Sequence, residues 1–520
     1  MKSAGLLVIV LLFLCGSTYA LAVSTGEYGT SITLGRLDLP SYPKDIASIR
    51  NVNHIVRYDS ASLDSFIQAQ MLSAHIPGLA TWCFKNGQVI WQQCYGYANL
   101  EDSIEVADTT LFSLASISKC VTGTAIMQLW ERGLFELDDD INDYLPFSVR
   151  CPVYPDSAIT FRMLMTHTSS IHDYDPIISP LWVAWGDSPI QLGTFLEEYL
   201  VPGGSYYSTA NYNGSVPGTE YEYTNVGIGL LGYLVEAIED SFPIHCQDSI
   251  FDPLSMYETT WFLADLDTNN LARAYHWTGS FYNRRPWWGG PFYPCGQLKS
   301  SVTELEQYLT AVVQYGMINT VRILDSTTVE LILSHQFEVG TDWWIGLIWH
   351  HIGWVFAGRW VWLHNGAGDG VDTFMAFCPD ENSAVISLTN CDNYGCSWTI
   401  AEALLDYALQ YAIEEHESSK PFILTLQVNP NPFRHHTDIR YQISENRNNV
   451  KVEVDAELMI HDVAGRLVKS FPVQPCVIGN PLSVKWDGTD QHNHQLSSGV
   501  YFLKLHAAGY GTAEKLLLIR

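Results

Sequence analysis

The stretch from Leu111 to Arg132 constrains the fold more than any other part of this chain. An apolar, strand-forming run passes into Ala115 to Lys119, and the apolar residues that follow recur at helical spacing. This pattern predicts a strand that leads into a helix, with Ser116 at the helix start. Ser116 and Lys119 then share one helix face, so the lysine nitrogen can reach the serine hydroxyl.

Such a pair is suited to nucleophilic catalysis. A serine hydroxyl needs a base, and lysine is a base only where burial or neighbouring charge lowers its pKa. The unpaired N–H groups at a helix start also suit a developing oxyanion. A serine that caps a helix ahead of an exposed lysine is the commoner arrangement, so residues elsewhere must decide between the two.

Length and charge limit the classes of protein to which this chain can belong. The 520 residues suffice for two or three domains, and 56 acidic against 27 basic residues give a net charge of -29. This balance repels phosphate backbones, so no nucleic acid is expected as a partner. No uninterrupted apolar stretch reaches about 18 residues, so no transmembrane segment is expected either.

The N-terminus has the pattern of an export signal: Lys2, an apolar core from Gly5 to Leu14, and small residues up to Ala22. This predicts a signal peptide over residues 1–22 and an exported protein, secreted or attached to the cell surface, with the periplasm as the alternative. In an exported protein some disulfides are plausible, and Cys391 and Cys396 are the pair expected to lie close together.

Local patterns along the chain predict one α+β domain over residues 23–415. Asn86-Gly87 between two strand-forming runs predicts a hairpin, and residues 173–222 lack a clear period, as in an irregular lid over a site. The expected helices are 52–74, 160–168, 226–238 and 398–415, and the expected later strands are 343–351, 354–363, 373–378 and 384–389. A polar linker at 416–424 then leads to short strands, which predict a small β-sandwich over 425–520.

Two later segments carry side chains that would complete the Ser116 site. Tyr223 and Asn225 are two residues apart and can face one side of an extended or tightly turned backbone. His364-Asn365-Gly366-Ala367 lies at a predicted strand edge, where glycine lets a substrate approach the backbone. Taken alone, Tyr223 and Asn225 are more often a turn, and only their order with the other segments argues for a site.

In this order S-x-x-K, Y-x-N and H-x-G resemble the three blocks of the serine β-lactamase and penicillin-binding-protein fold. The resemblance is to the class C β-lactamase-related family, with its esterases, D-aminopeptidases and D,D-carboxypeptidases, over roughly residues 50 to 415. It implies an antiparallel sheet flanked by helices, a helical region, and an acyl-enzyme hydrolase without cofactor or metal. The implied substrate is a small ester, amide or peptide.

The resemblance also implies a role for each residue. Ser116 would be the nucleophile, Lys119 and Tyr223 would transfer the proton, and which of these two is the base stays open. The implied substrate-binding residues are Asn225, His364, Gly366 and Ala367, with the N–H groups of Ser116 and Ala367 as the oxyanion hole. His364 replaces the lysine of classical β-lactamases, so a fixed positive charge for a substrate carboxylate is absent and antibiotic hydrolysis is disfavoured. Ser170 and Ser255 stand where the family usually has glycine.

Other patterns have structural interpretations or rivals. His167 is interpreted as a satisfied structural histidine, and Gly227 to Gly232, although it matches G-x-G-x-x-G, as close helix packing, because no βαβ unit surrounds it. The rival to an enzyme is a catalytically silent surface protein of the penicillin-binding fold that binds a peptide or cell-wall ligand.

The tail resembles the C-terminal secretion and sorting domains of Bacteroidota-type export systems and FlgD-type Ig-like modules. Its marks are Asn429 to Phe433, Asp462 to Val468, Trp486 to Gly488 and Ser498 to Phe502. The resemblance implies an export machinery as partner of this domain. An accessory β-domain that only stabilises or binds is the alternative.

Overall fold

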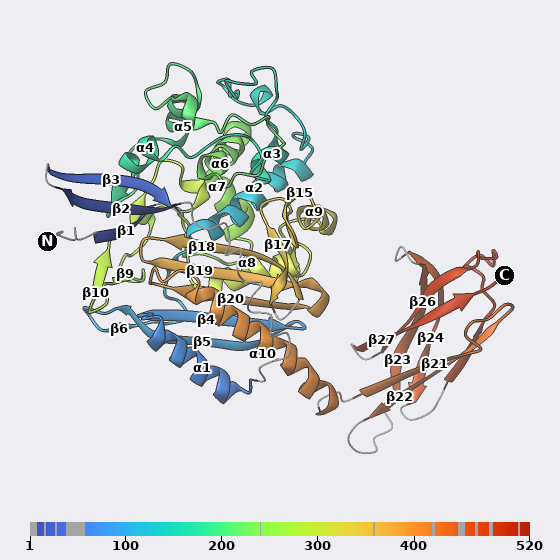
Figure 1. The fold of residues 1–520 in the computed structure, drawn as a ribbon. Coiled ribbons are helices and arrows are strands. Elements are labelled where there is room, and N and C mark those ends of the chain that lie inside the picture. Colours follow the sequence, from blue (N-terminus) through green and yellow to red (C-terminus); the bar gives the residue numbers. More distant parts are fainter. Residues whose placement is uncertain are drawn as a thin grey trace. The chain divides into compact units, whose positions relative to one another are not determined.

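A computed structural model describes residues 8–520 except 15–16, 27–28, 38–57, 240, 357–358, 419–421, 446–452, 463–465, 478–481 and 508–509. The chain forms two compact units, residues 1–411 and 412–520 (Figure 1). Among the residues described, no helix has both the length and the apolar character needed to cross a bilayer.

A nine-stranded antiparallel sheet organises the first unit, with strand order β15-β16-β17-β18-β19-β20-β4-β5-β6. Pairing of β20 with β4, from Thr389 opposite Leu79 to Ser383 opposite Lys85, joins the early and late parts of the chain. The strands are β4 (Gly78–Lys85), β5 (Gln88–Asn99), β6 (Ile104–Glu105), β15 (Phe337–Gly340), β16 (Trp343–Ile345), β17 (His350–Phe356), β18 (Arg359–Gly368), β19 (Val371–Cys378) and β20 (Ser383–Thr389).

Helices cover both faces of this sheet. Successive strand residues point to opposite sides, and both sides carry apolar side chains that need covering. Cys83 packs in a core shared with α1 (Ser60–Ser73) and α10 (Cys396–Ser418), whereas Trp82 and Phe84 pack in the larger core on the other face. Figure 1 shows α1 and α10 on one side of the sheet and the helical region on the opposite side.

The helical region surrounds α2 (Ser118–Glu131), whose residues Ser118 to Leu129 are all buried. The other helices of the first unit are α3 (Phe161–Met165), α4 (Asp175–Ile178), α5 (Leu192–Leu200), α6 (Asn225–Glu239), α7 (Phe242–Cys246), α8 (Val302–Val313) and α9 (Ser326–Ile332). Short strands connect these elements: β7 (Phe112–Ser113), β8 (Val183–Ala184), β9 (Ala274–Trp277), β10 (Tyr282–Arg285), β11 (Trp288–Gly289), β12 (Lys299–Ser300), β13 (Met317–Ile318) and β14 (Val321–Arg322).

The expected hairpin and the expected helices are present. Asn86 and Gly87 both have positive φ, 51° and 86°, as a tight turn of this kind requires. Helix α1 begins at Ser60, where the Asp59 side chain accepts from the Ser62 N–H, while the predicted residues 52–57 lie outside the described part. The sulfur atoms of Cys391 and Cys396 lie 3.6 Å apart, which agrees with their expected closeness.

Three predictions about local structure are wrong. The predicted strand 354–363 is divided between two strands, because residues 354–356 belong to β17 and residues 359–363 to its antiparallel partner β18. The irregular segment 173–222 contains the helix α5, whose short amphipathic run was hidden among prolines, glycines and aromatic residues. The predicted strand 343–351 is two strands, because a turn at 346–349, with Ile348 at a φ of 75°, separates β16 from β17.

The second unit has the predicted β-sandwich form. Two sheets, β21-β22-β25 and β24-β23-β26-β27, enclose a core that includes Ile439 from one sheet and Leu503 from the other. The strands are β21 (Phe422–Asn429), β22 (Thr437–Glu445), β23 (Glu453–Asp462), β24 (Leu467–Val477), β25 (Leu482–Trp486), β26 (Gly499–Ala507) and β27 (Tyr510–Leu518). Helix α10 and β21 leave only 419–421 of the predicted linker between them, and these residues are outside the described part. The strands β24 and β27 were not among those predicted.

Near the N-terminus, β1 (Val8–Leu14), β2 (Ser17–Gly26) and β3 (Gly29–Leu37) form a three-stranded antiparallel sheet. The export signal over residues 1–22 is not tested by this backbone arrangement and stays a prediction.

Candidate active site

Ser116 lies in a short 3-10 turn, Ala115–Ile117, that leads directly into α2. Ala115, just before it, has a φ of 47°, a left-handed conformation that L-residues rarely adopt. Backbone strain of this kind persists where the surrounding structure enforces it, and it is common at functional sites. Because the turn that contains Ser116 leads directly into α2, the predicted position of Ser116 at a helix start is confirmed.

Lys119, on the first turn of α2, is fully buried and has three hydrogen-bond acceptors. Its Nζ donates to Ser116 Oγ at 3.0 Å, to Asn225 Oδ1 at 2.8 Å and to the Cys295 carbonyl oxygen at 2.8 Å. An ammonium group has three N–H donors, so all of them are used here. The lysine nitrogen also lies 4.7 Å from the centre of the Tyr223 ring.

Burial shifts both titratable groups beside Ser116, in opposite directions. It lowers the pKa of Lys119, because a low-dielectric surrounding disfavours the charged ammonium. Burial of the phenol raises the pKa of Tyr223 well above its usual value, and a hydrogen bond with the Ser116 side chain opposes that rise only in part. The residue as a whole is 36% exposed, so part of the ring borders open space.

Asp173 holds the segment that carries Asn225. Its Oδ2 accepts from the backbone N–H of Asn225 at 2.7 Å and from the Asn225 side-chain amide at 2.9 Å. Its Oδ1 accepts from the hydroxyl of Thr224 and the N–H of Val226, at the start of α6. With its amide nitrogen bound to Asp173, Asn225 turns its oxygen toward Lys119.

The glycines of α6 bring the Cys295 carbonyl within reach of Lys119. A Cβ added at Gly229 would lie 2.9 Å from Phe292 Cβ, and one at Gly232 would lie 2.5 Å from Pro294 Cγ. The 292–295 segment therefore packs against bare helix backbone, which confirms close packing as the function of the G-x-G-x-x-G pattern.

The H-x-G segment of β18 lies beside the Ser116 turn. Strand β17 pairs with β18 at Val361 to Leu363 and again at Arg359, so it leaves residues 364–368 without a partner on that side. A Cβ at Gly366 would lie 2.1 Å from the Leu114 carbonyl oxygen. The glycine predicted to allow close approach makes room for the chain's own backbone, and its contact with a substrate stays a prediction.

Three buried histidines lie close to Lys119. His364, predicted to bind substrate, is 1% exposed, and its Nδ1 bonds the Asn365 carbonyl at 2.8 Å. Burial lowers the pKa of His364 and of His167 well below the usual value, and that of His350 to about 4. In the described part of the chain, the Nε2 atoms of His167 and His364 have no hydrogen-bond partner.

His167 has a structural role that was only partly foreseen. Its Nδ1 accepts the Thr224 N–H at 3.2 Å, and its ring centre lies 4.5 Å from that of Tyr223. His167 therefore holds the Tyr223 to Asn225 segment by a hydrogen bond to Thr224 and a ring contact with Tyr223.

The structure thus brings together Ser116, Lys119, Tyr223 and Asn225, and it places Gly366 next to the Ser116 turn. Sequence reasoning missed Asp173 and the Cys295 carbonyl. A lone aspartate at the start of an irregular segment has no distinctive spacing, and a backbone acceptor has no side-chain signature at all.

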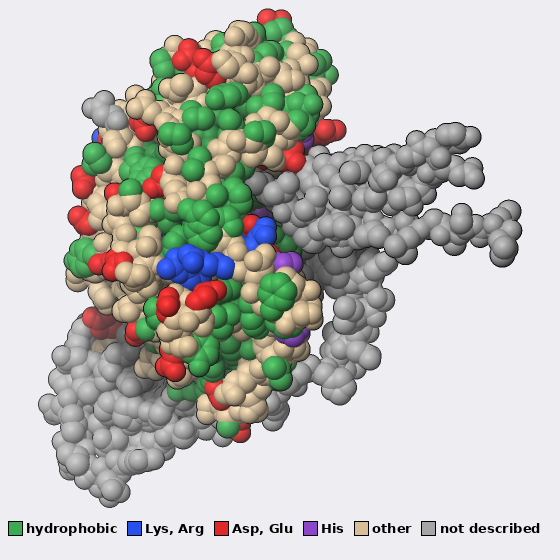
Figure 2. Space-filling model, turned by 90° about the vertical axis from the view of Figure 1, so that its left-hand side faces the viewer, with side chains coloured by type: hydrophobic (Ala, Val, Ile, Leu, Met, Phe, Trp, Pro, Cys, Tyr) green, Lys and Arg blue, Asp and Glu red, His purple; other side chains and the backbone are tan. Residues whose placement is uncertain are grey.

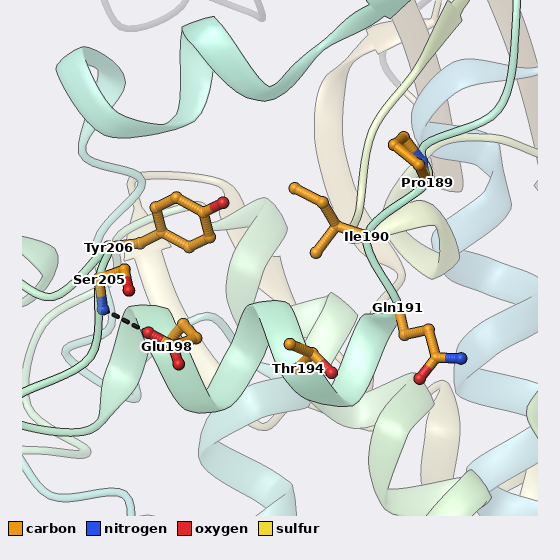
Figure 3. Close-up of a pocket in the computed structure, with 7 residues that line it drawn as sticks. All are labelled: Pro189, Ile190, Gln191, Thr194, Glu198, Ser205 and Tyr206. Atoms are coloured by element: carbon orange, nitrogen blue, oxygen red, sulfur yellow. Dashed lines mark hydrogen bonds between the residues drawn. The ribbon is translucent and has the colours of Figure 1, made fainter.

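Two hollows lie along α5, and the predicted site residues line neither of them. One, of about 510 Å³, is lined by Pro189, Ile190, Gln191, Thr194, Glu198, Ser205 and Tyr206 (Figure 3). The other, of about 530 Å³, extends toward Tyr293 and Gln297. Within the described ranges, the residues that could hold a metal ion together are Asp490, His492 and His494, which belong to the second unit.

Comparison with known proteins adds a family match. The family model described as Beta-lactamase matches residues 63–407. Protein flp of Staphylococcus aureus (strain MRSA252) is 26% identical over 221 residues, which are 42% of this chain and 41% of that protein. The chain therefore spans less than half the length of this curated relative.

Solved structures share the fold at lower identity. A penicillin-binding protein homologue from Pyrococcus abyssi, described as octameric, superimposes with a TM-score of 0.55 at 18% identity, covering 88% of this chain and 100% of that chain. EstCE1, described as a hydrolase with promiscuous acyltransferase activity, gives 0.54 at 19% identity and covers 67% of this chain and 99% of its own. At such identities the likeness shows the fold alone.

Proposed function

Because this chain belongs to the beta-lactamase family, whose members are mostly serine hydrolases, we propose that it is a serine hydrolase that forms an acyl-enzyme on Ser116. The observation that carries the proposal is the buried Lys119 nitrogen, 3.0 Å from the Ser116 hydroxyl oxygen. A nucleophilic serine needs a base at this distance, and a buried lysine can supply one.

The three acceptors around Lys119 favour it as the base. In the neutral amine, two N–H groups can donate to Asn225 Oδ1 and to the Cys295 carbonyl, which leaves the lone pair directed at Ser116. The Ser116 proton can then move to Lys119 as Ser116 Oγ attacks the substrate carbonyl carbon. The resulting ammonium regains the three donor contacts without any rearrangement.

Tyr223 fits the opposite role. Its raised pKa keeps the phenol neutral at physiological pH, so it can donate a hydrogen bond rather than remove a proton. We assign it to proton delivery: the phenol gives its proton to the leaving group and takes one back from the Lys119 ammonium, since Ser116 Oγ by then carries the acyl group. The N–H groups of Ser116 and Ala367 would stabilise the oxyanion, each contributing about 3 kcal/mol.

We propose small esters or amides as the substrate class. The histidines next to the site have lowered pKa values and are neutral at pH 7, so the wall that contains His364 offers no fixed charge. This differs from the lysine that the third block of classical β-lactamases carries, and it argues against a preference for β-lactam antibiotics. EstCE1, of the same fold, is described as a hydrolase with acyltransferase activity.

A covalent probe tests the proposal. We expect a fluorophosphonate or a fluorescent penicillin to label the wild-type protein and to leave Ser116→Ala unlabelled. Ser73→Ala, a change at an exposed serine of α1, is the matched control and should label like wild type. The probe should be combined with a panel of p-nitrophenyl esters and D-amino-acid amides.

The same experiment separates the enzyme from a silent binding protein of this fold. If neither probe nor panel shows Ser116-dependent reaction while both variants stay folded, the catalytic proposal fails. Ser116-dependent turnover of one substrate class would identify the acyl group that the site accepts.

Export remains a proposal of its own. The pattern at residues 1–22 supports a signal peptide, and the phrases in the tail support a sorting module that an export machinery recognises. Secretion of the full chain, and its loss when residues 425–520 are removed, would support the second assignment.

A further inference from the structure

Two arginines in the first unit rest on tryptophan rings. The Arg273 guanidinium carbon lies 4.6 Å from the centre of the Trp287 ring, and that of Arg284 lies 4.6 Å from Trp185 and 6.0 Å from Trp287. These distances are typical of cation–π contacts. On the face in Figure 2, Lys and Arg side chains lie beside hydrophobic side chains and also beside Asp and Glu side chains.

Among the residues that the structure describes, no carboxylate oxygen lies within 4.0 Å of a guanidinium nitrogen of either arginine. The nearby Asp369 is already bound, to Arg285 and to the Trp288 indole N–H at 3.0 Å. The Glu101 carboxylate accepts from the Tyr275 hydroxyl. Two unpaired cations beside each other are unusual in a chain with a net charge of -29.

The two cations also repel each other. Burial and the neighbouring Arg284 charge lower the pKa of Arg273, although its carboxylate neighbours Glu101 and Asp102 oppose the shift. The Asp102 carboxylate is held by the Asn99 amide at 2.8 Å. An anion bound between the two guanidinium groups would relieve this repulsion.

The ring beneath Arg284 is held in a strained backbone. Trp185 has a φ of 64°, which is a genuine outlier for a bulky residue, and it remains 51% exposed. The backbone N–H of Trp185 donates to the backbone carbonyl of Trp287 at 2.7 Å, next to the pairing of β8 with β11. Strain that fixes an exposed tryptophan under an unpaired arginine indicates a ligand-binding role.

This cluster is tied to the strand that carries the H-x-G segment. Asp369, which binds Arg285 and Trp288, follows Gly368 at the end of β18. The same strand places Gly366 against the Ser116 turn. Arg285 and Trp288, the sequence neighbours of Arg284 and Trp287, are thus hydrogen-bonded to the end of the strand whose Gly366 contacts the Ser116 turn.

We propose that Arg273 and Arg284, stacked on Trp287 and Trp185, bind a carboxylate on the substrate, at a position remote from the acyl bond that Ser116 attacks. The inference rests on the proposed hydrolase function. Planar guanidinium groups match the two oxygens of a carboxylate. The Trp287 indole N–H donates to the Ala272 carbonyl at 3.1 Å, so the two arginines supply the donors to the anion. The substrate class is therefore an ester or amide with a distant anionic end.

Matched esters test the proposal on the full chain. Mono-p-nitrophenyl esters of the dicarboxylic acids from adipate to azelate are compared with neutral p-nitrophenyl alkanoates of equal carbon number. We expect the wild type to prefer one length of the anionic series in kcat/KM, mainly through KM. Arg284→Gln and Arg273→Gln should each reduce that preference by about 3- to 30-fold. Arg284→Lys should retain part of it.

Arg434→Gln is the control, because it removes the same charge from an exposed position in the second unit and should keep the wild-type preference. If the anionic preference is absent, or equal in wild type and Arg284→Gln while Ser116-dependent turnover persists, the arginine site is wrong and the hydrolase proposal stands.

Calorimetric titration with adipate tests the site without turnover. Binding to wild type and to Arg434→Gln that is lost in Arg284→Gln supports the site even if no ester is hydrolysed. No adipate binding, or equal binding of inorganic phosphate, overturns the assignment to a carboxylate.

Discussion

Lys119 is the residue whose protonation controls the proposed chemistry. Burial lowers its pKa from the ordinary 10.5, so the neutral amine forms at lower pH than for an exposed lysine. We expect the rate of Ser116 acylation to rise with pH along a limb whose midpoint lies below 10.5. Fluorophosphonate inactivation rates measured across the pH range give this midpoint.

Tyr223→Phe provides the control for that profile. If Lys119 is the base, removal of the phenol lowers the rate but leaves the midpoint in place. A midpoint at or above 10.5, or one that moves in Tyr223→Phe, contradicts the assignment of Lys119.

Asp173 is a positioning residue that acts through Asn225. Asp173→Asn replaces an acceptor-only carboxylate by a group whose amide must face other N–H donors, so Asn225 loses its orientation toward Lys119. We expect acylation to slow by about 10- to 100-fold, since hydrogen bonds to a charged group are worth about 1.5–3 kcal/mol. The measurement is the acylation rate together with the melting temperature.

Asp187→Asn is the matched control for Asp173. The Asp187 carboxylate also accepts two backbone N–H groups, those of Leu263 and Ala264, but it has no contact with Asn225. Comparable loss of acylation in both variants would mean that Asp173 acts only on stability.

At the scale of single residues, the sequence identified catalytic candidates whose spacing lets their side chains meet. Ser116 with Lys119, and Tyr223 with Asn225, follow from short local separations and from their order. Asp173 could not be found in this way, because its partner Asn225 is 52 residues away and only the fold brings them together.

Among the elements, β18 depends on close contact with the Ser116 turn. Gly366→Ala would place a methyl group 2.1 Å from the Leu114 carbonyl oxygen, so the strand must move away from Ser116. We expect at least a tenfold loss of acylation, and a loss of stability of about 1–3 kcal/mol from overpacking. Thermal denaturation and probe labelling give the two values.

Gly340→Ala in β15 is the control, because an added Cβ there has no atom within 4 Å. It should leave labelling unchanged. Full labelling of Gly366→Ala would show that the strand tolerates the shift and that Ala367 has no precise role.

Local patterns predicted the elements well wherever a residue type forces a conformation. Asn86-Gly87 predicted its hairpin for this reason. Ser170 and Ser255, which stand where glycine was expected, have φ values of 64° and 59°, so the backbone keeps the conformation that favours glycine. The turn between β16 and β17 was missed because Ile348 has a positive φ without any such residue to indicate it.

For the whole molecule, the fold class was predictable and the strand order was not. The change to short strand-forming runs after residue 415 indicated a second domain. The division of the chain into units 1–411 and 412–520 agrees with this. The pairing of β20 with β4 joins residues about 300 positions apart, and no local pattern encodes such a contact. The family resemblance implied an antiparallel sheet flanked by helices, but it did not give the order of the strands.

Separate cores predict separate stability. Trp486 is fully buried in the second unit, with its indole N–H bonded to the Thr489 carbonyl at 2.9 Å. Trp486→Ala should cost this unit about 3–5 kcal/mol, a large part of the roughly 5–15 kcal/mol that stabilises a typical domain. Calorimetry of the full chain should show one transition lowered, with kcat/KM for a Ser116-dependent ester unchanged.

Trp82→Ala, at a fully buried position in the first unit, should give the reverse pattern: the other transition falls and ester turnover falls with it. Since the cores that contain Trp82 and Trp486 share none of the described residues, we expect each substitution to lower the transition of its own unit. A Trp486→Ala variant that lost turnover in step with its own transition would show that the catalytic unit depends on the sandwich for its fold.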